Sequence, residues 1–251
     1  MKFGWIPDLP DHRDRYHTTN LRKALPVAVD MRPQSPPVYD QGSLGSCTAQ
    51  SIAGALHFTQ LESRKVTQVD TPSRLFIYYN TRVLQGTVNE DSGATLRNTI
   101  KAVVNDGFGP EINWPYKVSA FKTKPPKSVY TNASERKLTN PCYERVENTN
   151  LLSIKSALAE NNPIIFGFTV YDSFLSDKVK KNGVVPMPKR SESTNGGHAM
   201  LIVGYNDLTR RFTVRNSWGK SWGHDGYCYM PYEFLTNDDL ANDFWVIKNV
   251  P

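Results

Sequence analysis

The sequence predicts an α+β fold of two lobes, a helical N-terminal lobe and an antiparallel β-sheet C-terminal lobe, with a ligand cleft between them. Apolar residues recur at helical intervals in the first half of the chain, and short apolar runs bounded by Gly, Asn and Asp fill the second half. Helices and strands segregated in this way indicate an α+β arrangement, and ligand sites tend to lie where two lobes meet. At 251 residues the chain can bury a large core without covalent cross-links.

The first segment, residues 1–25, precedes any periodic pattern. It is rich in Pro and Asp, includes the charged run 11–15, and shows neither helical nor strand spacing. We therefore predict an extended arm anchored by Trp5. Two roles stay open for this arm: it lies along the cleft and inhibits or buttresses the domain, or it is a surface strap packed against the domain.

The remaining residues, 26–251, form the predicted domain, in which the helical lobe spans about 40–117 and the β lobe about 140–240 together with 26–39. Amphipathic spacing predicts helices in the first lobe at 47–61, 73–84 and 96–106. The second lobe is predicted to contain a short helix at 151–160 and strands at 164–168, 198–205, 211–215 and 226–230. The polar stretch 118–141 is interrupted by prolines and has no clear period, so we expect it to cross between the lobes.

The net charge of +6 and the isoelectric point near 9.1 would suit acidic partners. Lys and Arg are nevertheless spread along the chain, and their densest stretch, Lys122–Lys127, contains two prolines, which is typical of a solvated loop. We therefore predict no nucleic-acid partner. No window approaches a membrane span and the N-terminus lacks the apolar stretch of a secretory signal, so we expect a soluble chain with no membrane partner.

The chain contains 3 cysteines, too few for a framework of several disulfides. Cys142 and Cys228 could pair, and nothing in the sequence decides whether they do. The cysteines and the 5 histidines are too dispersed for metal-ligand spacing, so we predict no metal and no cofactor. Sparse cysteines favour the cytoplasm or another reducing compartment.

Cys47 follows the Gly-rich run 41–46 and begins an amphipathic helical pattern. A cysteine at a helix N-terminus feels the positive end of the helix dipole, which favours thiolate over thiol, so we expect a lowered pKa. Gln41 carries an amide N–H that can donate to an oxyanion. His198 opens a predicted strand after two glycines, and Asn216 begins the run Asn-Ser-Trp-Gly. These side chains supply the nucleophile, oxyanion donor, base and orienting group that thiol-based acyl transfer requires.

This constellation resembles the papain/cathepsin family of cysteine proteases. The resemblance covers most of the chain: residues 26–32 are similar to the family's mature N-terminus, 114–116 to its Tyr-Pro-Tyr segment and 216–227 to its Asn-Ser-Trp-Gly block. Leu44 stands where the family has a half-cystine, and Thr48 replaces the aromatic residue that usually follows the nucleophile. These departures indicate an atypical, disulfide-poor branch, bacterial or viral, and a viral origin would place the chain in a virion or host cell.

The resemblance implies a papain-like fold and a role for each site residue. Cys47 is the expected nucleophile, His198 the base and later the acid, and Asn216 the residue that orients the imidazole. Gln41 is the expected side-chain donor of the oxyanion hole, with the backbone N–H of Cys47 as the second donor. The expected substrate-binding residues are Gly93, Gly197, Trp218, Asn242 and Asp243. Asn242 or Asp243 is expected at the floor of the second non-primed pocket.

The sequence thus predicts a cysteine endopeptidase that hydrolyses polypeptides through a thiolate–imidazolium pair and a thioester intermediate. An occluding loop with a histidine, which restricts a relative to removing dipeptides, is not expected because no histidine lies between His57 and His198. Family zymogens carry a longer pro-segment, and we expect the short arm to autoinhibit a monomeric enzyme. Two alternatives stay open: a papain-fold acyl transferase that uses an amine acceptor, and a catalytically inactive papain-fold binding module.

Overall fold

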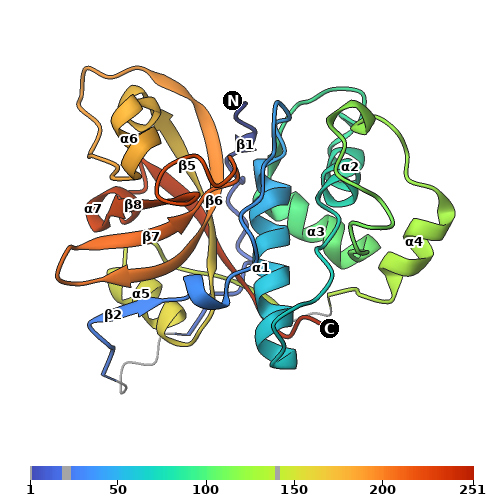
Figure 1. The fold of residues 1–251 in the computed structure, drawn as a ribbon, viewed down its shortest axis with the longest axis horizontal. Helices are drawn as coiled ribbons and strands as arrows, with labels where there is room; N and C mark the ends of the chain where they lie inside the picture. Colours follow the sequence, from blue (N-terminus) through green and yellow to red (C-terminus); the bar gives the residue numbers. More distant parts are fainter. Residues whose placement is uncertain (1, 19–23, 139–141) are drawn as a thin grey trace.

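The computed structural model describes residues 2–18, 24–138 and 142–251. The chain forms two lobes that meet along helix α1 (Cys47–Arg64), with helices on one side and a sheet on the other (Figure 1). This arrangement confirms the predicted α+β fold, with a helical N-terminal lobe and an antiparallel β lobe. Because α1 is buried along most of its length and contacts both lobes, a single hydrophobic core extends across the junction.

The helical lobe contains α1, α2 (Arg74–Gln85), α3 (Leu96–Asp106), α4 (Lys127–Ser134) and the 3₁₀ turn η2 (Val118–Ala120). Side-chain caps set where two of the helices begin: Ser73 accepts from the N–H of Phe76, and Thr95 accepts from that of Asn98. α2 ends at Gly86, which adopts the left-handed conformation common after helix C-termini. α1, α2 and α3 lie close to the bounds predicted for them.

The stretch 118–141, predicted to have no clear period and to cross between the lobes, contains two helical segments that the sequence did not indicate; residues 139–141 lie outside the described residues. η2 and α4 occupy it, and α4 packs Val129 and Ala133 against Phe76 of α2. α4 has only 8 residues and no side-chain cap at its N-terminus. Neither a start signal nor a long period therefore marks it in the sequence.

The β lobe is built on a sheet with strand order β4-β9-β5-β6-β7-β8, in which β2 also pairs with β6 and all neighbours run antiparallel. Its strands are β2 (Ala28–Asp30), β4 (Tyr143–Arg145), β5 (Ile164–Tyr171), β6 (Thr194–Asn206), β7 (Arg211–Arg215), β8 (Tyr227–Pro231) and β9 (Ala241–Ile247). The short helices of this lobe are η1 (Arg32–Gln34), α5 (Leu151–Ala159), η3 (Asp172–Leu175), α6 (Asp177–Asn182) and α7 (Tyr232–Leu235).

The N-terminal arm lies at the junction of the lobes. Its strand β1 (Trp5–Ile6) pairs in parallel with β3 (Ala94–Thr95) of the helical lobe. On the other side, the N–H of Gly4 donates to the carbonyl of Gly197 in β6 at 3.0 Å. In Figure 1 the N-terminal segment accordingly runs between α1 and the sheet. The arm is therefore hydrogen-bonded to both lobes at once.

Cys142 and Cys228 are both buried free thiols, so the disulfide that the sequence left open is not formed. Over residues 2–18, 24–138 and 142–251, no helix is long and apolar enough to cross a membrane. The same residues contain no group of His, Cys, Asp and Glu side chains arranged to hold a metal ion.

Candidate active site

Cys47 is the first residue of α1, and its side chain is fully buried at the lobe junction. The turn that leads into α1 is held on both sides: the N–H of Gly45 donates to the Asp91 carboxylate at 3.1 Å, and the Tyr116 hydroxyl donates to the Gln41 carbonyl at 2.9 Å. The thiol is thereby fixed at the positive end of the helix dipole.

His198 in β6 and Asn216 at the end of β7 come together because these strands are antiparallel neighbours. His198 Nε2 lies 2.8 Å from Asn216 Oδ1, which also accepts from the N–H of Ser217 at 2.8 Å. Since an amide oxygen only accepts, Nε2 carries the proton, and Nδ1, which has no hydrogen-bond partner, is the basic nitrogen. Trp218 stacks on the imidazole with ring centroids 4.7 Å apart, and so covers this hydrogen bond.

The Gln41 side chain is fully buried, and a neighbour orients its amide. The Ser217 hydroxyl donates to Gln41 Oε1 at 2.7 Å, which leaves Nε2 as the donor that faces the arm. Gln41 Nε2 donates to the Leu44 carbonyl at 2.9 Å and to the Lys2 carbonyl at 3.1 Å. The Lys2 carbonyl oxygen of the arm therefore accepts a hydrogen bond from the Gln41 amide that the sequence predicts as an oxyanion donor.

The arm covers the catalytic candidates. The Phe3 ring lies 6.2 Å from the His198 ring and 6.1 Å from that of Trp218, measured between centroids. Gly4 follows, and its carbonyl accepts from the N–H of Ala94 at 2.7 Å. A Cβ on Gly4 would lie 1.9 Å from the Gly45 carbonyl oxygen, so only glycine fits there.

Trp5 fills a pocket beside the catalytic residues, which we call the Trp5 pocket; it is formed by Gly167, Gly197 and Asp243. A Cβ on Gly167 would lie 2.0 Å from the Trp5 ring, so the indole packs directly on the backbone of β5. The Trp5 indole N–H donates to Asp243 Oδ2 at 3.1 Å. The pocket therefore combines room for a large ring with a buried hydrogen-bond acceptor.

Burial changes the protonation of the candidate catalytic pair, Cys47 and His198. It raises the pKa of the Cys47 thiol to about 11, although the backbone N–H groups of Ala199 and Gly4 act to lower that pKa. Burial also lowers the pKa of His198 to about 4, against the hydrogen bond with Asn216, which raises it. The lowered thiol pKa expected from the helix dipole is not found in the arm-docked state, because burial of the thiol outweighs the dipole. Thiol and imidazole are both neutral near pH 7 in this state.

The next part of the arm is held by charged groups. The Asp8 carboxylate accepts from the backbone N–H of Arg97 at 3.0 Å, the indole N–H of Trp245 at 3.2 Å and the Arg145 guanidinium at 3.4 Å. Asp14 of the arm lies 2.6 Å from Arg97 and 2.9 Å from Arg145. Burial and the neighbouring Asp243 raise the pKa of Asp8 to about 6, whereas Arg97 acts to lower it.

The structure brings most of the predicted substrate-binding residues to the arm. Gly93, Gly197, Trp218 and Asp243 all contact it or lie close to it: a Cβ on Gly93, for example, would lie 2.3 Å from the Gly4 carbonyl oxygen. Asn242 is different, because its side-chain amide donates to the Asp238 carbonyl instead. Sequence reasoning missed Asp91, Arg97 and Arg145. Asp91 lies two residues before Gly93 but was given no role of its own, and only tertiary contacts reveal what these three side chains do.

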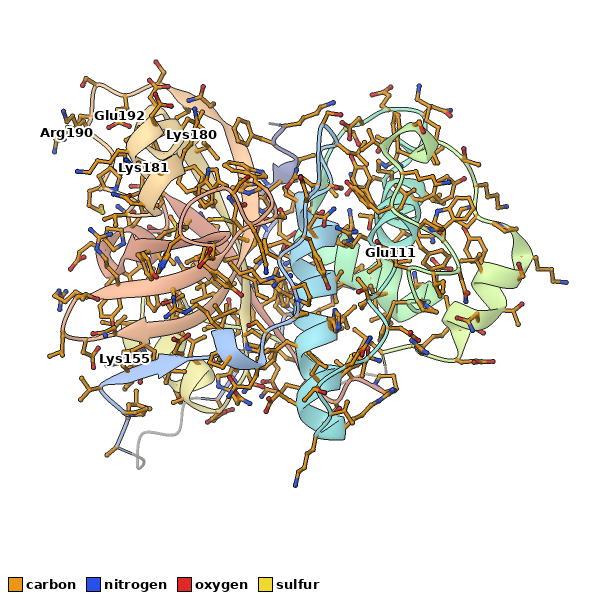
Figure 2. The ribbon with its side chains drawn as sticks, viewed as in Figure 1. Glu111, Lys155, Lys180, Lys181, Arg190 and Glu192 are labelled. Atoms are coloured by element: carbon orange, nitrogen blue, oxygen red, sulfur yellow. The ribbon has the colours of Figure 1, made fainter. Side chains whose placement is uncertain are left out.

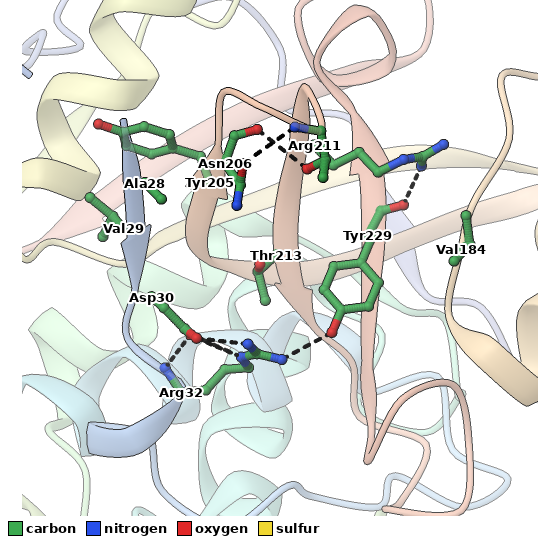
Figure 3. Close-up of a pocket in the computed structure, with 11 residues that line it drawn as sticks. Ala28, Val29, Asp30, Arg32, Val184, Tyr205, Asn206, Arg211, Thr213 and Tyr229 are labelled. Carbon is green, nitrogen blue, oxygen red and sulfur yellow. Dashed lines mark hydrogen bonds and ion pairs between the residues drawn. The ribbon is translucent and has the colours of Figure 1, made fainter. Parts of the chain in front are cut away.

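Another pocket, of about 430 Å³, lies in the β lobe and is lined by residues of β2, β6, β7 and β8 (Figure 3). Its cations already have partners: Arg32 pairs with Asp30 at 2.7 Å, and Arg211 donates to the Val185 carbonyl at 2.7 Å. None of the catalytic candidates lines this pocket. Figure 2 shows Lys180 and other basic side chains at the outer end of the same lobe, away from α1.

Comparison with known proteins shows which family and which structures the chain resembles. The profile of papain family cysteine proteases matches residues 25–244. An uncharacterized peptidase-like protein of Acanthamoeba polyphaga mimivirus is 40% identical over 99% of this chain and 87% of its own length. Cysteine proteinase 3 of Entamoeba histolytica is 29% identical over 84% of this chain and 65% of its own length.

Among solved structures, xylellain, a cysteine protease from Xylella fastidiosa, superposes with a TM-score of 0.91 at 41% identity, covering 99% of this chain and 96% of xylellain. Digestive procathepsin L 3 of Tenebrio molitor superposes at 0.74 with 19% identity over 95% of this chain and 75% of its own, which shows a shared fold. The matched profile spans the catalytic candidates, and the xylellain match extends over nearly the whole chain, arm included. The chain belongs to the papain family of cysteine proteases.

Proposed function

We propose that this chain is a cysteine endopeptidase whose N-terminal arm holds it inactive. The observation that carries the proposal is the hydrogen bond from Gln41 Nε2 to the Lys2 carbonyl, made while Phe3 covers His198. A backbone segment thus lies against the residues that we propose as the thiol-protease site, which supports a cleft that accepts an extended polypeptide. The same contacts support both parts of the proposal: the site accepts an extended peptide, and the chain's own arm competes for it.

The reaction begins when His198 Nδ1 takes the proton of Cys47, which gives a thiolate and an imidazolium. The sulfur attacks the carbonyl carbon of the scissile peptide, and the carbonyl oxygen becomes an oxyanion that accepts from Gln41 Nε2 and the Cys47 backbone N–H. The imidazolium then donates its proton to the leaving nitrogen, the C–N bond breaks, and a thioester remains. His198 next removes a proton from water, whose oxygen attacks the thioester, releasing the carboxylic acid and restoring the thiol.

Asn216 and Trp218 support this sequence of steps through the imidazole. The Asn216 oxygen accepts from Nε2 in both the neutral and the charged ring, so the base keeps one orientation throughout. A neutral amide also leaves the proton on the imidazolium. Trp218, stacked on the ring, keeps water from competing for that hydrogen bond.

The docked arm blocks the reaction in two ways. It occupies the Gln41 donor, and it buries the catalytic pair so that thiol and imidazole are neutral. Formation of the thiolate–imidazolium pair requires water or substrate dipoles in place of the apolar Phe3 ring. Release of the arm is therefore the activating step.

The Trp5 pocket is proposed to bind the side chain at the second position before the scissile bond. Gly167 leaves room for a large aromatic ring, and the Asp243 carboxylate accepts from an N–H at the floor. We expect aromatic and basic side chains there, because tryptophan, lysine and arginine can all donate to Asp243. Gly93 and Gly197 are proposed to approach the substrate backbone as they approach the arm.

The test compares the full-length chain with Gly4→Ala, whose added Cβ would collide with the Gly45 carbonyl and expel the arm. Gly4→Ala should hydrolyse a fluorogenic peptide with an aromatic second-position residue at least about tenfold faster than the unmodified chain. It should also react with an epoxide inhibitor of thiol proteases. Addition of Cys47→Ser should abolish both. Leu9→Ala changes an arm residue that is 81% exposed and should keep the low activity.

Two results would change the proposal. Labelling of Gly4→Ala without hydrolysis, together with transfer of the acyl group to an added amine, would make the protein an acyl transferase. Absence of both labelling and hydrolysis in a folded Gly4→Ala chain would leave a binding module and overturn the proposal.

A further inference from the structure

The arm residue Asp8 sits in a built carboxylate site, which we call the Asp8 site. It consists of the backbone N–H of Arg97, the guanidinium of Arg145 and the indole N–H of Trp245. One Asp8 oxygen accepts from Arg97, and the other accepts from Arg145 and Trp245, at 3.0, 3.4 and 3.2 Å respectively. The Asp8 side chain is 0% exposed. Both oxygens of a buried carboxylate are therefore recognised by separate donors.

The donors belong to the domain, which holds each of them through contacts of its own, although the arm's Asp14 also contacts Arg145. Arg97 is the second residue of α3, where backbone N–H groups point outward without intrahelical partners. Arg145 in β4 lies directly opposite Trp245 in β9, and its guanidinium carbon stands 4.8 Å from the centre of the Trp245 ring. Arg145 also contacts Asp243 at 3.0 Å. The site therefore keeps its shape when the arm leaves.

Departure of the arm leaves an excess of positive charge at this site. The arm supplies two carboxylates, Asp8 and Asp14, to the guanidinium groups of Arg97 and Arg145. Among the described residues outside the arm, Asp243 is the anion that remains in contact with Arg145. The Arg97 and Arg145 side chains are 11% and 16% exposed while the arm is docked. Once they have lost the arm carboxylates, these cations attract a replacement carboxylate.

The Asp8 site adjoins the Trp5 pocket. The Asp243 carboxylate oxygen that accepts from the Trp5 indole also accepts from the backbone N–H of Asp8 at 2.8 Å. Two arm residues, Ile6 and Pro7, lie between Trp5 and Asp8, and the Asp8 site lies beyond the Trp5 pocket on the path away from Cys47. A peptide with one side chain in the Trp5 pocket therefore reaches the Asp8 site with residues farther from its scissile bond.

We propose that, after the arm has left, the Asp8 site binds an acidic side chain of the polypeptide substrate, one to three residues before the residue that fills the Trp5 pocket. The proposal rests on the proposed function, in which the arm vacates a peptide-binding cleft. The Asp8 site adds a preference for a negatively charged substrate side chain, which the catalytic groups do not impose. The enzyme would then select peptides with an acidic residue upstream of an aromatic or basic one.

The test uses full-length Gly4→Ala and peptides that carry Asp, Glu, Asn or Gln at each of the three candidate positions. In the docked arm, burial and Asp243 raise the pKa of Asp8 to about 6. A substrate acid meets the same donors without Asp14, which pairs with Arg97 and Arg145 in the arm, so we expect it to bind in the ionised form at pH 7.5. At one position the acidic peptide should show about tenfold higher kcat/KM than its amide counterpart, as expected for a charge-assisted hydrogen bond. This acid-to-amide ratio should fall toward one in Arg145→Gln and in Trp245→Phe, which removes the indole donor. Arg136→Gln, a charge change outside the site, should keep it.

Binding is measured in parallel, with the same peptides and the inactive chain that combines Gly4→Ala with Cys47→Ser. Tighter binding of the acidic peptides supports the site even if no peptide is hydrolysed, in which case the proposed function alone fails. Equal kcat/KM and equal Kd for acidic and amide peptides at all three positions would overturn the inference while leaving the protease intact. Addition of NaCl should weaken the preference for the acidic peptide.

Discussion

The indole N–H of Trp5 donates to the Asp243 carboxylate at 3.1 Å, which joins the arm to the floor of the pocket beside the catalytic pair. The same oxygen accepts from the backbone N–H of Asp8 at 2.8 Å. The buried Asp243 carboxylate thus contacts both the Trp5 side chain and the backbone of the arm at Asp8. The segment that closes the site also shows which features of a peptide the site recognises.

Replacement of Asp243 should change the substrate preference at the Trp5 pocket. Asp243 has φ of 58°, a region that asparagine tolerates, so Asp243→Asn keeps the backbone while removing the charge. In the Gly4→Ala background, the ratio of kcat/KM for a second-position arginine to that for a second-position phenylalanine should fall about tenfold. A paired library of fluorogenic peptides measures this ratio. An unchanged ratio would remove Asp243 from the pocket floor.

Gln41→Ala should slow the chemical step more than it weakens substrate binding. Loss of one oxyanion donor lowers kcat by about two to three orders of magnitude. Steady-state kinetics of Gly4→Ala with and without Gln41→Ala separate kcat from KM. Gln34→Ala, an exposed glutamine nearby in sequence, is the matched control. A rise in KM with unchanged kcat would assign Gln41 to substrate binding alone.

Arm docking should weaken as the pH rises through about 6. The pKa of Asp8 is raised from 3.8 to about 6 when docked, so the protonated carboxyl favours the docked state. This contribution is fully present below about pH 4 and is lost above the docked pKa. The ratio of activity of the unmodified chain to that of Gly4→Ala cancels the pH dependence of catalysis, and it should rise about tenfold between pH 5 and pH 7.5.

The groups that face Asp8 set the control for this experiment. Asp243 raises its pKa, Arg97 lowers it, and Arg145 and Trp245 complete its surroundings. Asp8→Asn cannot titrate and should flatten the activity ratio over the same range. A ratio that still rises in Asp8→Asn would assign the pH dependence of docking to another group.

Arg82 should be essential for the stability of the helical lobe. Its fully buried guanidinium donates to the carbonyls of Val88, Glu90 and Phe121 and lies 4.3 Å from the centre of the Tyr78 ring. Arg82→Met removes these donors and leaves buried carbonyls unpaired, which should cost about 3 kcal/mol or more in the free energy of unfolding. Urea denaturation measures this cost.

A surface arginine provides the comparison for Arg82. Arg136 makes a 3.5 Å ion pair with Asp70, whose side chain is 57% exposed. Arg136→Met should change the free energy of unfolding by less than about 1 kcal/mol. Similar costs for the two substitutions would contradict the structural role given to Arg82.

The sequence singled out most residues of the candidate site because each lies in a short run with a local signal. Cys47 follows glycines at a helix start, and His198 and Asn216 end or begin apolar strand patterns, so each residue carries a local signal. The helices with polar caps and the strands with apolar runs were predictable for the same reason. α4 lacks a cap and is short, and the prediction failed there.

The position of the arm depends on contacts that no local pattern encodes. Asp8 and Asp243 are 235 residues apart in sequence, and their contact arises only when both lobes have folded. The same holds for the protonation of the catalytic pair: the helix dipole at Cys47 is a local feature, whereas burial by Phe3 and Gly4 is a tertiary one. Burial prevails because loss of hydration disfavours the thiolate more strongly than the dipole favours it.

Trp5 is enclosed between Gly167 and Gly197, so its fluorescence depends on whether the arm is docked. The indole is 7% exposed and packs on the backbone of β5, in a largely water-free setting. When the arm withdraws, this fluorophore enters solvent, and its emission moves to longer wavelength. Because Trp5 is the only tryptophan among the first 25 residues, Trp5→Phe isolates the signal. The spectrum of the unmodified chain thus reports arm withdrawal directly, without substrate or label.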